Sequence, residues 1–133
     1  MKREIEFRAK NINDQWRYGY LERQDLLYDE NYDCSSTIQI ETLGQYIGLK
    51  DKTGKKIYEG DVVKFIDYDS YDEGFENAGV VKYGGNMFYV TNRYSLDMED
   101  LVDDLEGFMY CEVIGNIHDD PEMWEEYDEK PNN

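Results

Sequence analysis

The sequence predicts a mainly β domain, and three observations carry that prediction. Short runs alternate apolar and polar residues along much of the chain, and turn-forming residues separate these runs. Aromatic residues make up 15% of the chain, and 13 of its residues are tyrosines, which suit strand faces that are wet on one side. A length of 133 residues fits one domain, which we place at residues 1–124, followed by an acidic, frayed tail at 125–133.

The N-terminal third begins with a predicted hairpin. Apolar residues alternate with charged ones over residues 4 to 10, and the alternation resumes over residues 16 to 20. Residues 22 to 36 are polar and acidic without a clear period, so we interpret them as a long connection with room for a helical turn. The apolar residues between 37 and 47 then predict a strand.

A lysine-rich turn at residues 51 to 54 joins that strand to the next apolar run. Its last residue, Gly54, can take a positive φ at little cost, and the chain returns at Ile57. A second turn, Glu59-Gly60-Asp61, opens the apolar strand at residues 62 to 66, and we expect Gly60, together with Gly115, to serve backbone geometry. A strand entered in this way is typical of small closed barrels.

The C-terminal half contains the clearest hairpin, with strands at residues 79 to 83 and 87 to 91 around a glycine turn. Residues 67 to 77 predict a solvated loop. Apolar residues at a helical spacing predict an amphipathic helix near residues 96 to 106, residues 108 to 117 predict a strand, and Asp120 and Pro121 predict the start of a short C-terminal helix. Together these elements predict a small, partly open SH3-like barrel.

The predicted core combines the apolar positions of these elements. It comprises Ile5, Phe7, Trp16, Leu49, Ile57, Val62, Val63, Phe65, Val80, Val81, Phe88, Val90, Leu101, Leu105, Val113, Ile114 and Ile117.

The net charge of −17 is concentrated in the C-terminal half. Residues 1 to 66 contain 11 basic and 12 acidic residues, whereas residues 67 to 133 contain 3 and 19. Such a field repels phosphate backbones and attracts basic partners, so we expect no direct binding of nucleic acid. Binding would require a segregated basic face, for which the chain offers Lys50, Lys52, Lys55, Lys56 and Lys64, with Tyr46 and Tyr58 as stacking groups.

Cysteine usage and hydropathy predict a cytoplasmic protein. Cys34 and Cys111 form no CxxC pair and have no metal-ligand spacing, so we interpret them as reduced thiols. No run of apolar residues is long enough for a signal peptide or a membrane span, so no membrane association is expected.

The residues that could carry chemistry do not form a recognisable site. His118 is the only histidine, and it lies beside carboxylates on a predicted turn without further nitrogen or sulfur ligands nearby. The acidic segments at residues 29 to 33 and 67 to 71 lack the glycine and the glutamate of a calcium loop. Thr53-Gly54-Lys55 lacks the spacing of a phosphate-binding loop. We therefore predict no catalytic, cofactor-binding or metal-binding residues, no cofactor, and a protein that is not an enzyme.

Three blocks of sequence together resemble the YopX family. They are Arg3-Glu4-Ile5-Glu6-Phe7-Arg8-Ala9, the stretch from Gln45-Tyr46-Ile47-Gly48-Leu49-Lys50-Asp51 through Ile57-Tyr58-Glu59-Gly60-Asp61-Val62-Val63, and Glu112-Val113-Ile114-Gly115-Asn116-Ile117 followed by Pro121-Glu122. The family pattern often has a Trp where this chain has Lys10. The resemblance implies a phage or prophage origin, a mostly β domain in the cytoplasm of a bacterial host, and a family without an assigned biochemical activity.

Two functions follow as hypotheses. The first is a non-enzymatic phage accessory protein that binds a host or phage protein through an aromatic surface or an edge strand. The negative charge of the chain favours a basic partner. The alternative is an acidic mimic of nucleic acid that blocks a basic host enzyme. Mimicry requires the acidic residues of 67 to 76, 97 to 106 and 119 to 129 to lie on one surface. A small β domain with exposed edges could also form homo-oligomers.

Overall fold

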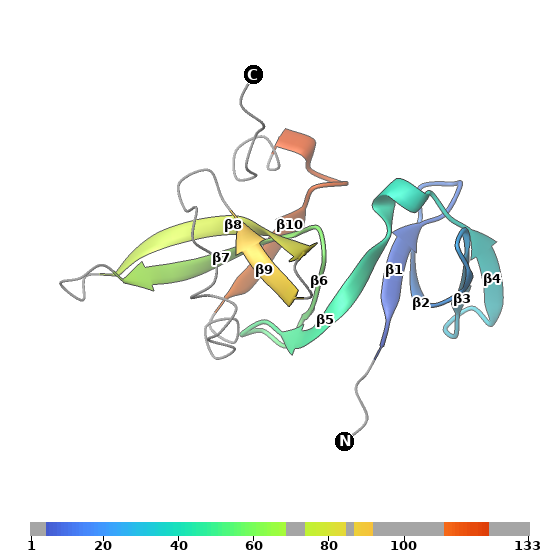
Figure 1. The fold of residues 1–133 in the computed structure, drawn as a ribbon, viewed down its shortest axis with the longest axis horizontal. Coiled ribbons are helices and arrows are strands. Elements are labelled where there is room, and N and C mark those ends of the chain that lie inside the picture. The colour runs from blue at the N-terminus through green and yellow to red at the C-terminus, as the bar shows by residue number, and fades with distance from the viewer. Residues whose placement is uncertain (1–4, 69–73, 85–86, 92–110, 123–133) are drawn as a thin grey trace. The chain divides into compact units, whose positions relative to one another are not determined.

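A computed structural model describes residues 5–68, 74–84, 87–91 and 111–122 of the chain (Figure 1). The chain divides into two compact units, Met1–Gly48 and Leu49–Asn133, which we describe separately. The prediction of a single domain at 1–124 stays a prediction. The predicted tail at 125–133 and the predicted helix near residues 96 to 106 lie outside the described residues.

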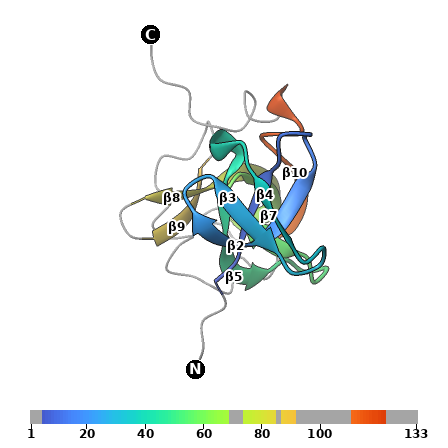
Figure 2. The same ribbon diagram turned by 90° about the vertical axis from the view of Figure 1, so that its right-hand side faces the viewer.

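The first unit is an antiparallel sheet with the strand order β4-β3-β2-β1-β5. Its elements are β1 (Phe7–Lys10), β2 (Trp16–Arg23), β3 (Leu26–Asp29), β4 (Cys34–Thr37), the 3₁₀ helix η1 (Ile40–Thr42) and β5 (Gly44–Lys50). Figure 2 looks onto this unit from the side of β4, the strand farthest from β5 in the sheet order. The β1–β2 pairing confirms the predicted N-terminal hairpin.

The prediction of a long connection at residues 22 to 36 was wrong, because β3 and most of β4 lie there. β3 is short but alternates in burial, with Leu27 fully buried, and its four residues pair with β4 in an unbroken register. Its polar neighbours obscured the alternation. The packing of Leu27 against the core, which a propensity argument does not contain, stabilises the strand.

The core of the first unit is small and lies on one face of the sheet. Ala9, Leu27 and Ile38 are buried together, and Phe7, Leu21 and Leu43 pack against them. Thr42 ties η1 to the sheet because its hydroxyl accepts a hydrogen bond from the Lys10 N–H at 2.8 Å and donates one to the Gln39 carbonyl at 2.7 Å. The prediction that Ile5 is a core residue was wrong, since 61% of it is exposed.

The second unit contains a four-stranded antiparallel sheet with the order β10-β7-β8-β9. Its strands are β7 (Asp61–Tyr68), β8 (Gly74–Gly84), β9 (Met87–Thr91) and β10 (Glu112–Asn116), and a short strand, β6 (Lys56–Tyr58), precedes them and neighbours β5. The β8–β9 pairing confirms the predicted glycine hairpin. The predicted loop at 67 to 77 was wrong at both ends, because β7 and β8 extend to Tyr68 and Gly74.

The second core is larger and largely follows the prediction. Among the predicted positions, those of β6 to β9 whose side chains are described are buried, whereas Val113, Ile114 and Ile117 are only half-buried. The buried apolar residues are Ile57, Tyr58, Val62, Val63, Phe65, Ala78, Val80, Val81, Val90 and Cys111. Leu101 and Leu105 lie outside the described residues.

The mainly β class is confirmed, but the barrel is not. The described strands form two sheets, and no closed barrel is present among them. The described residues of the first unit bury apolar side chains in a core of their own. Of the predicted C-terminal helix, Pro121 and Glu122 are helical, and the rest lies outside the described residues.

Candidate interaction surface

The second face of the first sheet, opposite its core, carries a row of aromatic side chains. In β2 the residues alternate, so Trp16, Tyr18 and Tyr20 share the face opposite Leu21, which pairs with the core residue Leu27. Tyr28 of β3 lies directly across from Tyr20. We call these four residues the tyrosine face. Tyr18 and Tyr20 remain 37% and 47% exposed, so the face is open to solvent among the described residues.

The tyrosines of this face are held in place. The Tyr20 and Tyr28 rings lie 5.2 Å apart between centroids with a tilt of 36°. The Tyr28 hydroxyl donates a hydrogen bond to the Asp33 carboxylate. This bond, followed by burial and by the negative charges of Asp33 and Glu30, raises the pKa of Tyr28 to about 12. Tyr28 is therefore a neutral, oriented donor throughout the physiological range of pH.

The other end of the tyrosine face is basic. The Arg8 guanidinium lies 4.8 Å and the Lys10 ammonium 5.5 Å from the centroid of the Trp16 ring, which are cation–π distances. Arg8 and Lys10 belong to β1 and pair in register with Tyr18 and Trp16. The indole is thus fixed by its neighbours, and the face runs from cations at β1 to tyrosines at β3.

A buried aspartate positions the β3 end of the face. The Asp29 carboxylate is 1% exposed and accepts hydrogen bonds from the backbone N–H of Tyr18 at 3.1 Å and of Asn31 at 2.9 Å. It joins β2 to the turn at residues 30 to 33, in which Asp33 takes a φ of +48°. The sequence placed Tyr18 and Tyr20 on one predicted strand without assigning them to a site. It missed Tyr28, because the polar neighbours of β3 obscured the alternation around Leu27.

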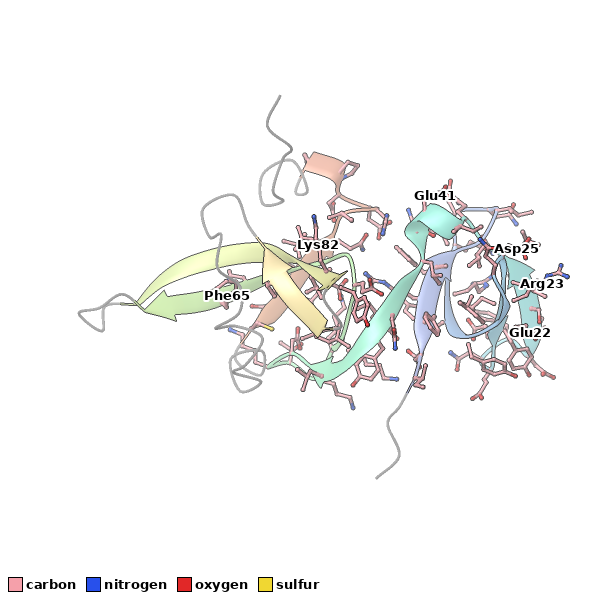
Figure 3. The ribbon with its side chains drawn as sticks, in the orientation of Figure 1. Glu22, Arg23, Asp25, Glu41, Phe65 and Lys82 are labelled. Carbon is pink, nitrogen blue, oxygen red and sulfur yellow. The ribbon has the colours of Figure 1, made fainter. Side chains whose placement is uncertain are left out.

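Acidic side chains line the outer strands of the same unit. Glu22, Arg23 and Asp25 lie around its β2–β4 end (Figure 3). The Ser35 hydroxyl of β4 donates a hydrogen bond to the Glu22 carboxylate at 2.6 Å. Arg23 and Asp25 form an exposed ion pair of 3.2 Å. The tyrosine face is therefore bordered by carboxylates on the β4 side.

The lysine-rich turn of the second unit is organised by Asp51. Its carboxylate is buried and accepts hydrogen bonds from the Thr53 N–H at 2.8 Å, the Thr53 hydroxyl at 2.6 Å and the Lys55 N–H at 2.9 Å. Its other oxygen accepts one from the Val113 N–H of β10 at 2.9 Å. Burial acts to raise the pKa of Asp51, but the hydrogen bonds together outweigh it and lower the pKa to about 2.

The second turn of this segment serves the same unit. Gly60 has a φ of +89°, which confirms the expected backbone role. Its N–H donates to the Val81 carbonyl at 2.8 Å, and its carbonyl accepts from the Ile117 N–H at 2.9 Å. The neighbouring Asp61 carboxylate, which is buried, accepts from the Tyr58 N–H at 2.8 Å. The turn thus joins β8 to the segment after β10.

Replacing Gly60 by Val should destabilise the second unit by about 3 kcal/mol. A β-branched residue at positive φ is strained by about 1–2 kcal/mol, and a Cβ at this position would lie 3.3 Å from the His118 Nε2. Urea unfolding followed by circular dichroism measures the change. Gly54→Val is the matched control, because Gly54 has a φ of +90° but no atom within 4 Å of the added Cβ. Equal losses in the two variants would contradict the contribution from His118.

The structure argues against the nucleic-acid hypothesis based on the lysine-rich turn. Tyr46 and Tyr58, the proposed stacking groups, are 5% and 3% exposed, so their rings cannot stack on bases. Lys50, Lys52 and Lys55 are exposed, and Lys52 lies 3.7 Å from the carboxylate of Glu112. These lysines are therefore exposed side chains on and beside a structural turn, without exposed aromatic rings from Tyr46 or Tyr58 to stack on bases.

The other reactive groups among the described residues are His118, Cys111 and Cys34. The backbone N–H of His118 donates a hydrogen bond to the side-chain oxygen of Asn116 at 2.9 Å within a turn, and the His118 ring lies beside Gly60. Burial, followed by the charge of Asp51, raises the pKa of Cys111 to about 11, so this thiol is protonated at neutral pH. Cys34 is exposed on β4. Within the described residues no three His, Cys, Asp or Glu side chains are placed to hold a metal ion.

Comparison with known proteins places this arrangement in a family. A family model described as YopX protein matches residues 2–125, which is most of the chain. The chain belongs to the YopX family. The YopX segment therefore includes both the tyrosine face and the turns built on Asp51 and Gly60. No match was found among curated proteins.

A solved structure supports the fold of this YopX-family chain. The chain is similar to the crystal structure of protein EF1440 from Enterococcus faecalis, with a TM-score of 0.56 and 18% sequence identity. The similarity covers 92% of this chain and 99% of that protein. In the part of the chain that the structure describes, no helix is long and apolar enough to cross a membrane.

Proposed function

We propose that this YopX-family chain is a non-enzymatic phage or prophage accessory protein that binds another protein through its tyrosine face. The observation that carries the proposal is the placement of Tyr18, Tyr20 and Tyr28 together on an open sheet face, with two of the rings in contact. Tyrosine is enriched at protein interfaces because it offers a large, rigid surface with a polar edge. The ordered rings reduce the entropy lost on binding.

The outer strand of the same sheet supports the proposal. β4 is the last strand in the order β4-β3-β2-β1-β5-β6 of the described strands. Its residues, Cys34 to Thr37, include no lysine or proline, which are the residues that proteins use to block strand addition. A partner can therefore bind by adding a strand to β4 while it covers the tyrosine face.

The proposal predicts that the tyrosine face is needed for capture of a partner. Full-length tagged protein is used to recover partners from bacterial lysate, with and without the changes Tyr18→Ser and Tyr20→Ser. We expect recovery of the specific partner to fall about tenfold or more in the double variant, because two exposed interface tyrosines are lost. Mass spectrometry with isotope-labelled lysates measures the ratio.

The matched control is Tyr83→Ser. Tyr83 lies on β8 of the second unit and is 52% exposed, so it is a tyrosine of similar accessibility that does not belong to the tyrosine face. Its replacement should leave recovery unchanged. Equal recovery by the wild type and the double variant would remove the basis of the proposal.

The alternative function, mimicry of nucleic acid, rests on the 19 acidic residues between 67 and 133. Most of the segments that would form the mimetic surface lie outside the described residues. The same pull-down at low and high salt distinguishes the two proposed functions, because attraction between charged surfaces is screened at high ionic strength. A basic nucleic-acid enzyme released by salt, and retained by the Tyr18→Ser, Tyr20→Ser variant, would favour mimicry.

A further inference from the structure

The surroundings of Tyr28 are acidic on the side that faces β4. The Asp33 carboxylate accepts a hydrogen bond from the Tyr28 hydroxyl, and Glu30 lies close enough for its charge to act on the same phenol. The Glu22 carboxylate is held by the hydroxyl of Ser35, the residue of β4 that pairs with Tyr28. Two carboxylates therefore act on Tyr28 directly, and a third is held at Ser35, the residue that pairs with it.

β4, the strand next to Tyr28, carries only short side chains. Along β4 the side chains are those of Cys34, Ser35, Ser36 and Thr37, and Ser35 shares the face of Tyr28. A strand added to β4 would lie two strand spacings from β3, which is about 9.6 Å. A long side chain from the added residue opposite Ser35 can cross the small serine and reach the Tyr28 ring. A short or branched side chain cannot.

We infer that the face takes an arginine or lysine side chain from an extended, basic segment of the partner protein, seated over Tyr28 and Tyr20 among Glu22, Glu30 and Asp33. The inference rests on the proposed function and adds the chemistry of the partner. A cation over an aromatic ring is attracted to its negative face, and nearby carboxylates add charge complementarity. The whole chain, with a net charge of −17, attracts basic partners over longer distances.

The charge of the first unit agrees with this assignment. Its described residues from 5 to 48 include eight acidic and four basic residues. Two of the basic residues, Arg8 and Lys10, are engaged by Trp16 at the β1 end of the face. The other two, Arg17 over the ring of Tyr32 and Arg23 paired with Asp25, are outnumbered near β4 by Glu22, Asp25, Glu30 and Asp33. The β4 end therefore carries net negative charge, which favours a cation of the partner and repels a phosphate.

The test uses the full-length protein and synthetic peptides of nine residues with alternating Thr and Val, which favour an extended backbone. The central residue is Arg, Lys, Gln or Glu, and the flanking residues are identical. Binding is followed by the amide signals of Cys34 to Thr37 and the ring signals of Tyr20 and Tyr28 in NMR spectra. We expect the Arg and Lys peptides to bind at least tenfold more tightly than the Gln peptide, and the Glu peptide to bind most weakly.

A variant with neutral side chains of the same shape distinguishes the effect of the carboxylate charges on binding from an effect on folding. Glu22→Gln, Glu30→Gln and Asp33→Asn keep the shapes of the side chains, and Asn tolerates the positive φ of residue 33. The triple variant should bind the Arg peptide at least tenfold more weakly and the Gln peptide as before. Glu41→Gln, an exposed acidic residue of η1, is the control and should change neither.

The outcomes distinguish the inference from the proposed function. If all four peptides bind equally at β4, the face binds protein segments but the requirement for a cation is wrong. If no peptide moves the signals of β4 or the tyrosines, the inference is overturned, and the proposed function is still decided by the tyrosine-face pull-down. Binding of a ten-nucleotide oligothymidine at Tyr20 and Tyr28 would also overturn it, because it would show that the negative end of the face accepts phosphates.

Discussion

Replacing Gly19 by Ala should unfold the first unit or destabilise it by about 4 kcal/mol or more. The added Cβ would lie 1.8 Å from the backbone carbonyl oxygen of Tyr28 and 2.8 Å from the carbonyl carbon. Neither atom belongs to a flexible side chain, so β2 and β3 would have to separate, with loss of the contact between Tyr20 and Tyr28. Thermal and urea unfolding of the full-length protein, followed by circular dichroism, measures the loss.

Gly48→Ala provides the contrast for this prediction. Gly48 has a φ of +91°, but nothing lies within 4 Å of an added Cβ. Its replacement should cost only the strain of a left-handed backbone, about 1–2 kcal/mol. The order of the two effects is the decisive result, since a rule based on positive φ alone predicts the reverse. A Gly19→Ala variant as stable as the wild type would contradict the observed β2–β3 spacing.

Replacing Asp51 by Ala should destabilise the second unit by about 4 kcal/mol. The change leaves the donors of Thr53, Lys55 and Val113 without their acceptor, and hydrogen bonds to a buried charged group are among the most costly to lose. Asp51→Asn should lose less, because the amide oxygen can still accept on one side. Urea unfolding of both variants, with Glu112→Gln as the control for an exposed ion pair, measures these differences.

The contribution of Asp51 should also depend on pH with a defined sign. Its pKa is lowered in the folded state from the ordinary 3.8 to about 2, so the unfolded chain takes up the proton first. The stabilisation is therefore complete above the unfolded value and is lost as the pH falls through about 2. The stability difference between the wild type and Asp51→Asn should narrow between pH 5 and pH 2. A difference that is constant over this range would contradict the role of the charged carboxylate.

The residues alone predicted several local features of this protein. Alternation identified the hairpin of β1 and β2, and the glycines at the turns identified the hairpin of β8 and β9 and the backbone role of Gly60. Three separate blocks of sequence carried the resemblance to the YopX family, which the match over residues 2–125 confirms. These signals are local, because a turn depends on a few adjacent residues and an alternation on one strand.

The candidate site depended on contacts between distant residues. Alternation indicates which tyrosines share a face of a strand, but not which face is covered, so Tyr46 and Tyr58 were taken as exposed when they are buried. The pairing of Tyr28 with Tyr20, and the neighbouring Ser35 of β4, required the position of a strand that the polar pattern of residues 22 to 36 had concealed.

Gly19 and Asp51, the positions with the largest expected effects on stability, show the same division between what the sequence and what the tertiary structure determine. Gly19 has no sequence feature that distinguishes it from an ordinary strand glycine, because its importance comes from a carbonyl on the neighbouring strand. Asp51 could be recognised as a turn residue, but its bond to Val113 spans 62 positions in the chain. Turns, hairpins joined by short turns, and the family follow from short-range chemistry. The exposed face, the close approach of strands and the buried carboxylate arise only when packing brings distant segments together.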